Sequence, residues 1–143
     1  MIVVDANYVL SAILDPVTTQ DGQMGSEARR LFRAAESAPF TTTDAVVAEI
    51  VYVLDRKYGL ARPQIAARLR PLLELDGCRL PTKRLCLRAL DLWEENPKWS
   101  IVDAMVVAQA REERAPLATF DADVRKTAGV PLWSPPTGQN GSA

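Results

Sequence analysis

The sequence contains no histidine among its 143 residues. A chain without histidine cannot build a Ser-His-Asp triad, a Cys-His dyad, a histidine-bound zinc site or the histidine pair of a metal-independent ribonuclease. Any hydrolytic chemistry must therefore rest on carboxylates, and we expect a metal ion to assist them.

Cysteine is scarce, with Cys78 and Cys86 as the only two residues of this kind. They are too few and too far apart in sequence for a thiolate metal cluster. We expect two buried free thiols, because unpaired cysteine packs as a small apolar residue. A disulfide between them is the alternative, although a reducing compartment would not require it.

Long apolar runs are also missing, since no stretch reaches the roughly eighteen uncharged residues of a membrane span. The first fourteen residues are apolar, but they lack a basic start and a small-residue cleavage site, and they include Asp5 and Asn7. This pattern does not match a signal peptide. We therefore expect a cytoplasmic protein that does not associate with membranes.

The composition, with 48% hydrophobic and 24% charged residues, suits one globular domain with a real core. We assign this domain to residues 1–134. Residues 135–143 are rich in proline, glycine and serine, which predicts a disordered tail.

Short apolar runs alternate with longer helical patterns along the chain, which predicts an α/β fold with a mostly parallel sheet covered by helices on both faces. Residues 15–25 are expected to form a loop, with Ser26 capping the next helix. The predicted strands are residues 2–4, 40–41, 78–80, 117–120 and 132–133. The predicted helices are residues 6–14, 27–37, 44–58, 62–75, 82–95, 101–114 and 122–128.

Two of the predicted strands end on an acid, at Asp5 and at Asp121. Ligands of open parallel sheets bind beyond the carboxyl ends of the strands, so both acids are candidates for a functional site. The alternative is structural: aspartate is a favoured helix N-cap, and helical sequence follows each of these residues.

Glu49 lies in DAVVAEIVYVLD, a helix that is apolar nearly all round and is therefore expected to be buried. An unpaired carboxylate in such a place is costly unless a cation or hydrogen-bond donors meet it. A metal site would satisfy this need, and a structural pair with Arg56 is the alternative.

Asp103 follows Ser100 at the spacing of a capping box, at the start of another apolar helix. The box alone would explain the residue. A functional role is also open, because a helix N-terminus favours a negative charge at this position.

These motifs resemble those of the PIN-domain ribonucleases, and among them the VapC-type toxins of toxin–antitoxin pairs. The resemblance covers residues 1 to about 133, through IVVDAN, VVAEIVYVL, WSIVDAMVVAQA and LATFDAD in that order. It implies a small parallel sheet between helices, with the acids gathered at one edge. The implied catalytic and metal-binding acids are Asp5, Glu49, Asp103 and Asp121, with Asp123 as an accessory acid and Asn7 and Thr119 as polar neighbours.

The resemblance further implies a metal-dependent endoribonuclease that hydrolyses RNA phosphodiesters. An all-oxygen ligand set selects Mg²⁺ or Mn²⁺ over zinc. The ion would lower the pKa of an attacking water, and the products would carry 5′-phosphate and 3′-hydroxyl ends. Glu49 would either bind the metal or orient the water. A cognate VapB-type antitoxin is the implied protein partner.

The net charge of −1 offers no general attraction for RNA. Arg125 and Lys126 are the basic residues closest in sequence to Asp121, so they are our candidates for phosphate contacts. The alternative is that they belong to a solvated helix face. A homodimer is also expected, with Trp93 and Trp99 as candidates for its interface or for the core.

The main rival hypothesis is a PIN-fold scaffold or binding protein that keeps the acids without turnover. A haloacid-dehalogenase-type phosphatase requires a second aspartate two residues after the first, where this sequence has Asn7. A receiver domain requires an acid pair at the first strand end, which is also missing. Both of these folds fit poorly.

Overall fold

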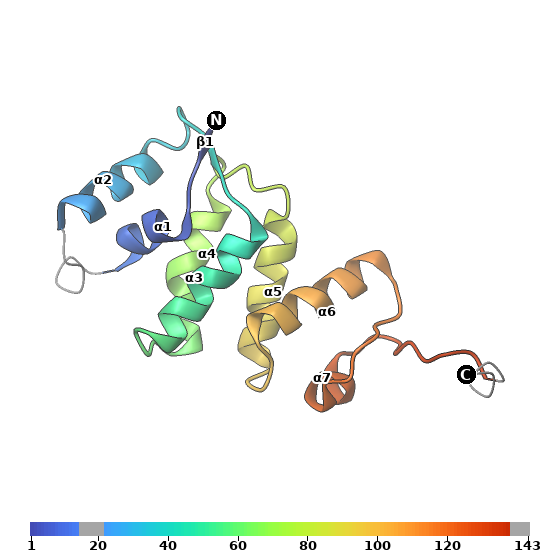
Figure 1. The fold of residues 1–143 in the computed structure, drawn as a ribbon. Helices are drawn as coiled ribbons and strands as arrows, with labels where there is room; N and C mark the ends of the chain where they lie inside the picture. The colour runs from blue at the N-terminus through green and yellow to red at the C-terminus, as the bar shows by residue number, and fades with distance from the viewer. Residues whose placement is uncertain (15–21, 138–143) are drawn as a thin grey trace.

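The computed structural model describes residues 1–14 and 22–137 of the chain. This part forms two short strands and seven helices (Figure 1). In chain order they are β1 (Ile2–Val3), α1 (Ala6–Ile13), α2 (Gly22–Arg33), β2 (Phe40–Thr41), α3 (Asp44–Arg56), α4 (Arg62–Glu74), α5 (Lys83–Glu95), α6 (Ile101–Glu113) and α7 (Ala122–Thr127).

The local chemistry of several helix ends explains their positions. The hydroxyl of Thr43 accepts a hydrogen bond from the backbone N–H of Val46 at 3.2 Å and caps α3. Gly59 ends the following turn with a φ of 63°, a conformation that suits glycine. Pro63 stands in the first turn of α4, where its missing N–H costs no helical hydrogen bond.

The small parallel sheet is confirmed, with Ile2 opposite Phe40 and Val3 opposite Thr41. Beyond β2, only an isolated parallel bridge joins Phe40 to Cys78. The other two predicted strands likewise meet in a single parallel bridge, between Leu117 and Leu132. The prediction of full strands at residues 78–80, 117–120 and 132–133 was therefore wrong for the part of the chain that the structure describes.

The prediction that Ser26 caps the second helix was wrong. Helix α2 begins at Gly22 and continues through Ser26. Of the predicted loop at residues 15–25, residues 15–21 lie outside the described residues and residues 22–25 belong to α2 instead. Gly25 is buried against α1, and a Cβ at this position would lie only 2.9 Å from the carbonyl oxygen of Ser11. The close packing of α2 on α1 therefore needs glycine inside the helix, and the sequence pattern around Ser26 did not show this.

The core consists of apolar faces from most of the helices. Trp93 and Trp99 are almost fully buried, as are both cysteines, which remain free thiols as predicted. Burial raises the pKa of the Cys86 thiol to about 11. The largest fully buried side chains are Trp99, Ile50, Leu54, Ile65, Leu69, Leu90, Val47, Val51, Val107 and Cys86.

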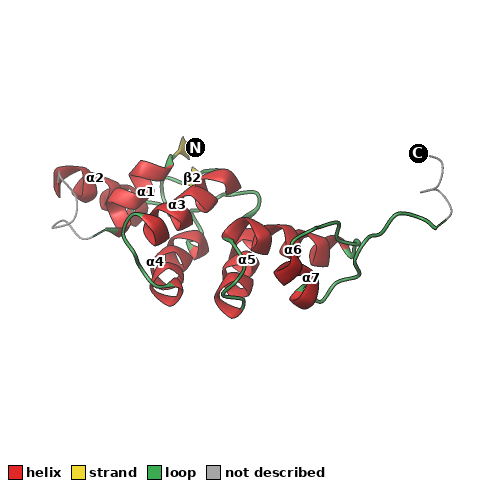
Figure 2. Ribbon diagram, turned by 60° about the horizontal axis from the view of Figure 1, so that its bottom comes forward, coloured by secondary structure: helices red, strands yellow, loops and turns green. Residues whose placement is uncertain are grey.

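From one end of the molecule to the other come α2, α1, the neighbouring α3 and α4, then α5, and finally α6 and α7 (Figures 1 and 2). β1 and β2 lie at the same end of the molecule as α1 to α4, and β1 is at its margin beside the N-terminus, with both of its residues exposed. None of the helices in residues 1–14 and 22–137 has the length and apolar character that crossing a membrane requires.

Candidate metal centre

Asp5 stands between β1 and α1 and caps the helix. Its Oδ1 atom accepts a hydrogen bond from the backbone N–H of Tyr8 at 2.9 Å. The side chain is exposed beside a hollow of about 300 Å³, which Val3, Val4 and Leu31 also line. Within the described residues the second carboxylate oxygen of Asp5 has no protein partner.

The two polar neighbours of Asp5 on α1 differ in their contacts. Asn7 is exposed. Tyr8 donates its hydroxyl hydrogen to Oε2 of Glu27 on α2 at 3.3 Å. Burial and the negative charge of Glu27 raise the pKa of Tyr8, so the phenol remains a neutral donor. This bond ties α2 to the helix that begins at Asp5.

Asp103 is half-buried in the first turn of α6 and forms the predicted capping box. Its backbone N–H donates to Oγ of Ser100 at 3.0 Å, and its Oδ2 atom accepts from the N–H of Ser100 at 2.9 Å. As at Asp5, one carboxylate oxygen is fixed by a backbone N–H. The other oxygen is unengaged within the part of the chain that the structure describes.

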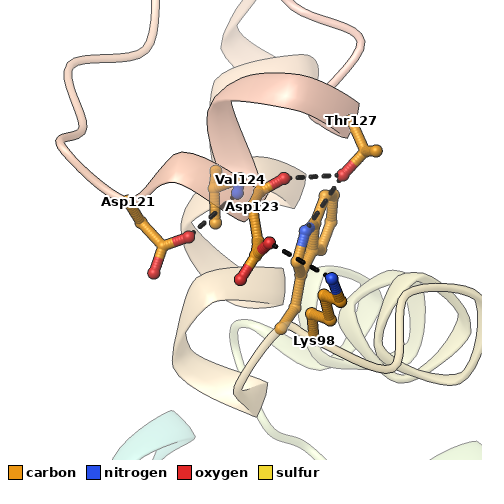
Figure 3. A network of polar contacts seen from close by, with 6 residues as sticks. Lys98, Asp121, Asp123, Val124 and Thr127 are labelled. Carbon is orange, nitrogen blue, oxygen red and sulfur yellow. Dashed lines mark hydrogen bonds and ion pairs between the residues drawn. The ribbon is translucent and has the colours of Figure 1, made fainter.

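Asp121 repeats this arrangement at the start of α7. Its Oδ1 atom accepts a hydrogen bond from the N–H of Val124 at 2.9 Å, as Figure 3 shows. Its own N–H donates to Oγ1 of Thr119 at 3.1 Å. Thr119, which was predicted as a polar neighbour, therefore fixes the backbone before the acid. The N-cap roles considered for Asp5 and Asp121 are both present.

Asp123, in the first turn of α7, lies near the ammonium group of Lys98. One of its carboxylate oxygens lies 3.9 Å from Nζ of Lys98, as Figure 3 shows. The neighbouring backbone is held as well, because Thr127 donates to the carbonyl of Asp123 at 2.9 Å and accepts from the indole N–H of Trp99 at 3.2 Å. Asp123 thus contributes to holding α7 against the start of α6.

Glu49 is exposed, which contradicts the prediction that it is buried. Helix α3 buries Val47 and Ile50 on one face but leaves Glu49 and Tyr52 open on another. The alternative pairing with Arg56 is also wrong for the described residues, since the guanidinium of Arg56 lies 3.7 Å from Asp55 and 5.8 Å from the centre of the Tyr52 ring. An apolar sequence does not show which face of a helix is covered.

Within one chain these acids do not gather at one place. In the part of the chain that the structure describes, no three acidic or cysteine side chains are grouped so that they could hold a metal ion. The strand that leads to Asp5 and the helix that Asp121 caps lie apart in both Figure 1 and Figure 2. The carboxylate chemistry suits a hard cation, but the placement of these residues in a single chain does not.

The two basic candidates lie on α7, where both are exposed. Arg125 donates to the carbonyl of Thr119 at 2.8 Å, and it lines an apolar hollow of about 570 Å³ with Phe120 and Trp133. Lys126 lines a separate hollow of about 350 Å³ beside Trp99.

Arg62 holds the segment before α6 and was not among the predicted site residues. Its guanidinium lies over the Trp93 ring, 4.4 Å from the ring centre. It donates to the backbone carbonyls of Trp93 at 2.7 Å, Asn96 at 3.3 Å, Pro97 at 2.9 Å and Trp99 at 2.8 Å. Arg62 therefore sets the path of the chain into the helix that carries Asp103, and its partners lie too far along the sequence for a local pattern to show them.

The chain matches one described family, the PIN domain, over residues 2–130. No curated protein matches the chain significantly. The matched range includes all four candidate acids, the two strands of the parallel sheet and all seven helices of the described part. The chain therefore belongs to the PIN domain family and has its nuclease-type fold.

Proposed function

We propose that this protein is a divalent-metal-dependent endoribonuclease of the VapC toxin type, with Asp5, Glu49, Asp103 and Asp121 as its catalytic and metal-binding residues. One structural observation carries the proposal. Three of these carboxylates, at the starts of α1, α6 and α7, each have one oxygen bound to a backbone N–H. Their other oxygens face no protein partner within the described residues.

This arrangement prepares a carboxylate for a cation. The bond to the backbone restricts rotation of the side chain, and the positive end of the helix favours its negative charge. The remaining oxygen is then held in a defined direction. Mg²⁺ and Mn²⁺ prefer oxygen ligands of this kind, and the sequence offers no histidine as an alternative.

Glu49 complements these three acids in a different way. It is exposed on α3 and has no hydrogen bond or ion pair within residues 1–14 and 22–137. A free carboxylate can bind the metal ion directly or orient the attacking water, and both roles remain part of the proposal. Asp123 serves as an accessory acid that Lys98 already neutralises in part.

The proposed partners follow from the same assignment. RNA is the substrate, with Arg125 and Lys126 near its phosphates, and a VapB-type antitoxin is the protein partner. A PIN-fold binding protein without turnover is the second candidate. It is favoured by the absence of any three-acid metal group in the described part of a single chain.

The test is digestion of RNA with Mg²⁺, with Mn²⁺ and with EDTA, using the wild type and Asp5→Asn. Asparagine caps a helix about as well as aspartate, so this change removes the charge and keeps the fold. We expect cleavage to fall by roughly two orders of magnitude or more, with 5′-phosphate ends on the remaining products.

Asp76→Asn is the matched control, because Asp76 is an exposed acid far along the chain from the four candidates. It should cleave like the wild type. Undiminished cleavage in EDTA, or by Asp5→Asn, would contradict the metal-dependent mechanism. A wild type with no cleavage in either metal would favour the binding protein.

A further inference from the structure

We propose that Arg62 and Trp99 are positioning residues that hold Asp103 in a fixed place relative to α7, the helix that Asp121 caps. Neither residue is assigned a contact with RNA, and each acts through the groups that it binds. The inference deepens the proposed function and rests on it, because it treats Asp103 and Asp121 as acids of the same reaction.

A single peptide group links Arg62 to Asp103. The carbonyl of Trp99 accepts a hydrogen bond from Nη2 of Arg62 at 2.8 Å. The N–H of Ser100, which belongs to the same peptide group, donates to Oδ2 of Asp103 at 2.9 Å. Because a peptide group is planar, fixing its carbonyl also fixes the direction of its N–H. The positive guanidinium polarises the group and strengthens the bond to the carboxylate. Arg62 therefore determines where the carboxylate of Asp103 is held.

The side chain of Trp99 supplies a second link, to α7. Its indole N–H donates to Oγ1 of Thr127 at 3.2 Å. Thr127 in turn donates its hydroxyl hydrogen to the carbonyl of Asp123 at 2.9 Å, as Figure 3 shows. Trp99 is only 1% exposed, so its ring cannot turn to another partner without disturbing a closely packed core. The helix that begins behind Asp121 is thus bound to the residue directly before the N-cap of α6.

The other contacts of Arg62 fix the plane of its guanidinium. The group lies over the Trp93 ring, 4.4 Å from the ring centre. It also donates to the carbonyls of Trp93, Asn96 and Pro97, at 2.7, 3.3 and 2.9 Å. Within residues 1–14 and 22–137 no carboxylate lies within ion-pair distance of it, so its charge acts on these carbonyl groups. Only the planar fork of arginine can hold several carbonyls in one geometry.

Two candidate acids therefore depend on one residue. Asp103 is reached through the backbone of Trp99, and the helix that Asp121 caps is reached through its indole ring. A misplacement of about 1 Å at a reacting group can slow a reaction by about a hundredfold. Loss of either link should slow cleavage without removing any group that contacts the RNA.

Nuclear magnetic resonance of the full chain tests the two links without any catalytic activity. The chain has three tryptophans, and Trp99→Phe identifies the indole signal of Trp99. In Arg62→Lys, the Ser100 amide and the Trp99 indole should shift and should exchange with solvent roughly tenfold faster. Arg68→Lys is the matched control and should leave both signals unchanged, because Arg68 is exposed on the same helix.

The amide of Tyr8, which donates to Asp5, is the internal reference and should keep its wild-type exchange rate in both variants. Equal acceleration at Tyr8 would mean that Arg62 only stabilises the whole fold, and it would overturn the proposal. Unchanged signals of Ser100 and Trp99 in Arg62→Lys would overturn it as well.

Cleavage kinetics provide the second readout, at a temperature where circular dichroism shows each variant folded. Thr127→Val removes the hydroxyl that Trp99 binds, at an exposed position, while Arg111 still holds the carbonyl of Ala128. In Thr127→Val and in Arg62→Lys, kcat should fall roughly tenfold or more with little change in KM. Thr127→Ser keeps the hydroxyl and should cleave like the wild type.

A wild-type kcat in Thr127→Val, or an equal loss in Thr127→Ser, would show that the link to α7 does not position the acids. If the wild type cleaves RNA and folded Arg62→Lys cleaves equally fast, the positioning role fails alone. If the Ser100 and Trp99 signals respond as expected and the wild type cleaves no RNA with Mg²⁺ or Mn²⁺, the proposed function fails alone.

Discussion

Replacing Arg62 with methionine should destabilise the fold more than any other substitution of an arginine on α4. Methionine keeps much of the apolar length of the side chain but removes the charge and all of its donors. Arg62 donates four hydrogen bonds to backbone carbonyls and lies over the Trp93 ring. Burial lowers the pKa of its guanidinium, which nevertheless stays charged at neutral pH.

The expected loss is roughly 3 to 5 kcal/mol. Hydrogen bonds to a charged group contribute about 1.5 to 3 kcal/mol each, but four bonds from one side chain are not additive. The contact with Trp93 adds about 1 kcal/mol. Arg62→Lys should lose an intermediate amount, since an ammonium keeps the charge but not the planar fork that reaches several carbonyls.

Urea unfolding measures these differences, with the slope of the transition as a check on two-state behaviour. Arg68→Met is the matched control, because Arg68 is exposed on the same helix and makes no hydrogen bond or ion pair within the described residues. It should change the free energy of unfolding by less than about 0.5 kcal/mol. A loss below about 1 kcal/mol for Arg62→Met, or equal losses for both variants, would refute the reasoning.

Two further predictions concern Glu49 and Cys86. Glu49→Gln should leave the free energy of unfolding within about 0.5 kcal/mol of the wild type, because the exposed carboxylate has no partner in the described residues. The same change should strongly reduce RNA cleavage. Thermal melts that show a large destabilisation would indicate a structural role for Glu49 instead. Burial raises the pKa of Cys86 from 9.0 to about 11, so the folded state retains this proton after the unfolded state has lost it. The contribution of this thiol to the free energy of unfolding is therefore complete below pH 9 and should fall by roughly 2 to 3 kcal/mol as the pH rises to 11. In urea unfolding, the free energy of unfolding of Cys86→Ala should decline less over this pH range than that of the wild type. An equal decline in both proteins would contradict the assignment.

The sequence predicts most of the helices well because their signals are local, whereas α2 begins at Gly22 and not at the predicted residue 27. Thr43 and Ser100 cap α3 and α6 through bonds to residues three positions on, and Gly59 ends its turn as its position indicates. The strands are less predictable, since a strand exists only through a partner that lies far away in sequence. Residues 117–120 have the composition of a strand, but the described chain gives them one bridge, at Leu117.

In the candidate site, too, the features that depend on local sequence are predictable and those that depend on distant residues are not. The acids and their places at the helix starts follow from sequence, and the structure confirms the caps at Asp5, Asp103 and Asp121. The exposure of Glu49 does not follow, because an apolar pattern cannot show which face of a helix other elements cover. The hydrogen bonds of Arg62 could not be predicted from the sequence either, since the carbonyl groups that accept them lie 31 to 37 residues away.

The caps at Asp5 and Asp121 do not compete with a catalytic role for these residues. A carboxylate has about four positions that accept a hydrogen bond or bind a cation, and capping occupies one of them. At both sites the bond to the backbone is 2.9 Å long and uses a single oxygen. The same bond that starts the helix also aims the second oxygen, so one residue type at one position can satisfy both demands. Asparagine separates the two demands, because it retains the cap and gives up the charge that a cation requires.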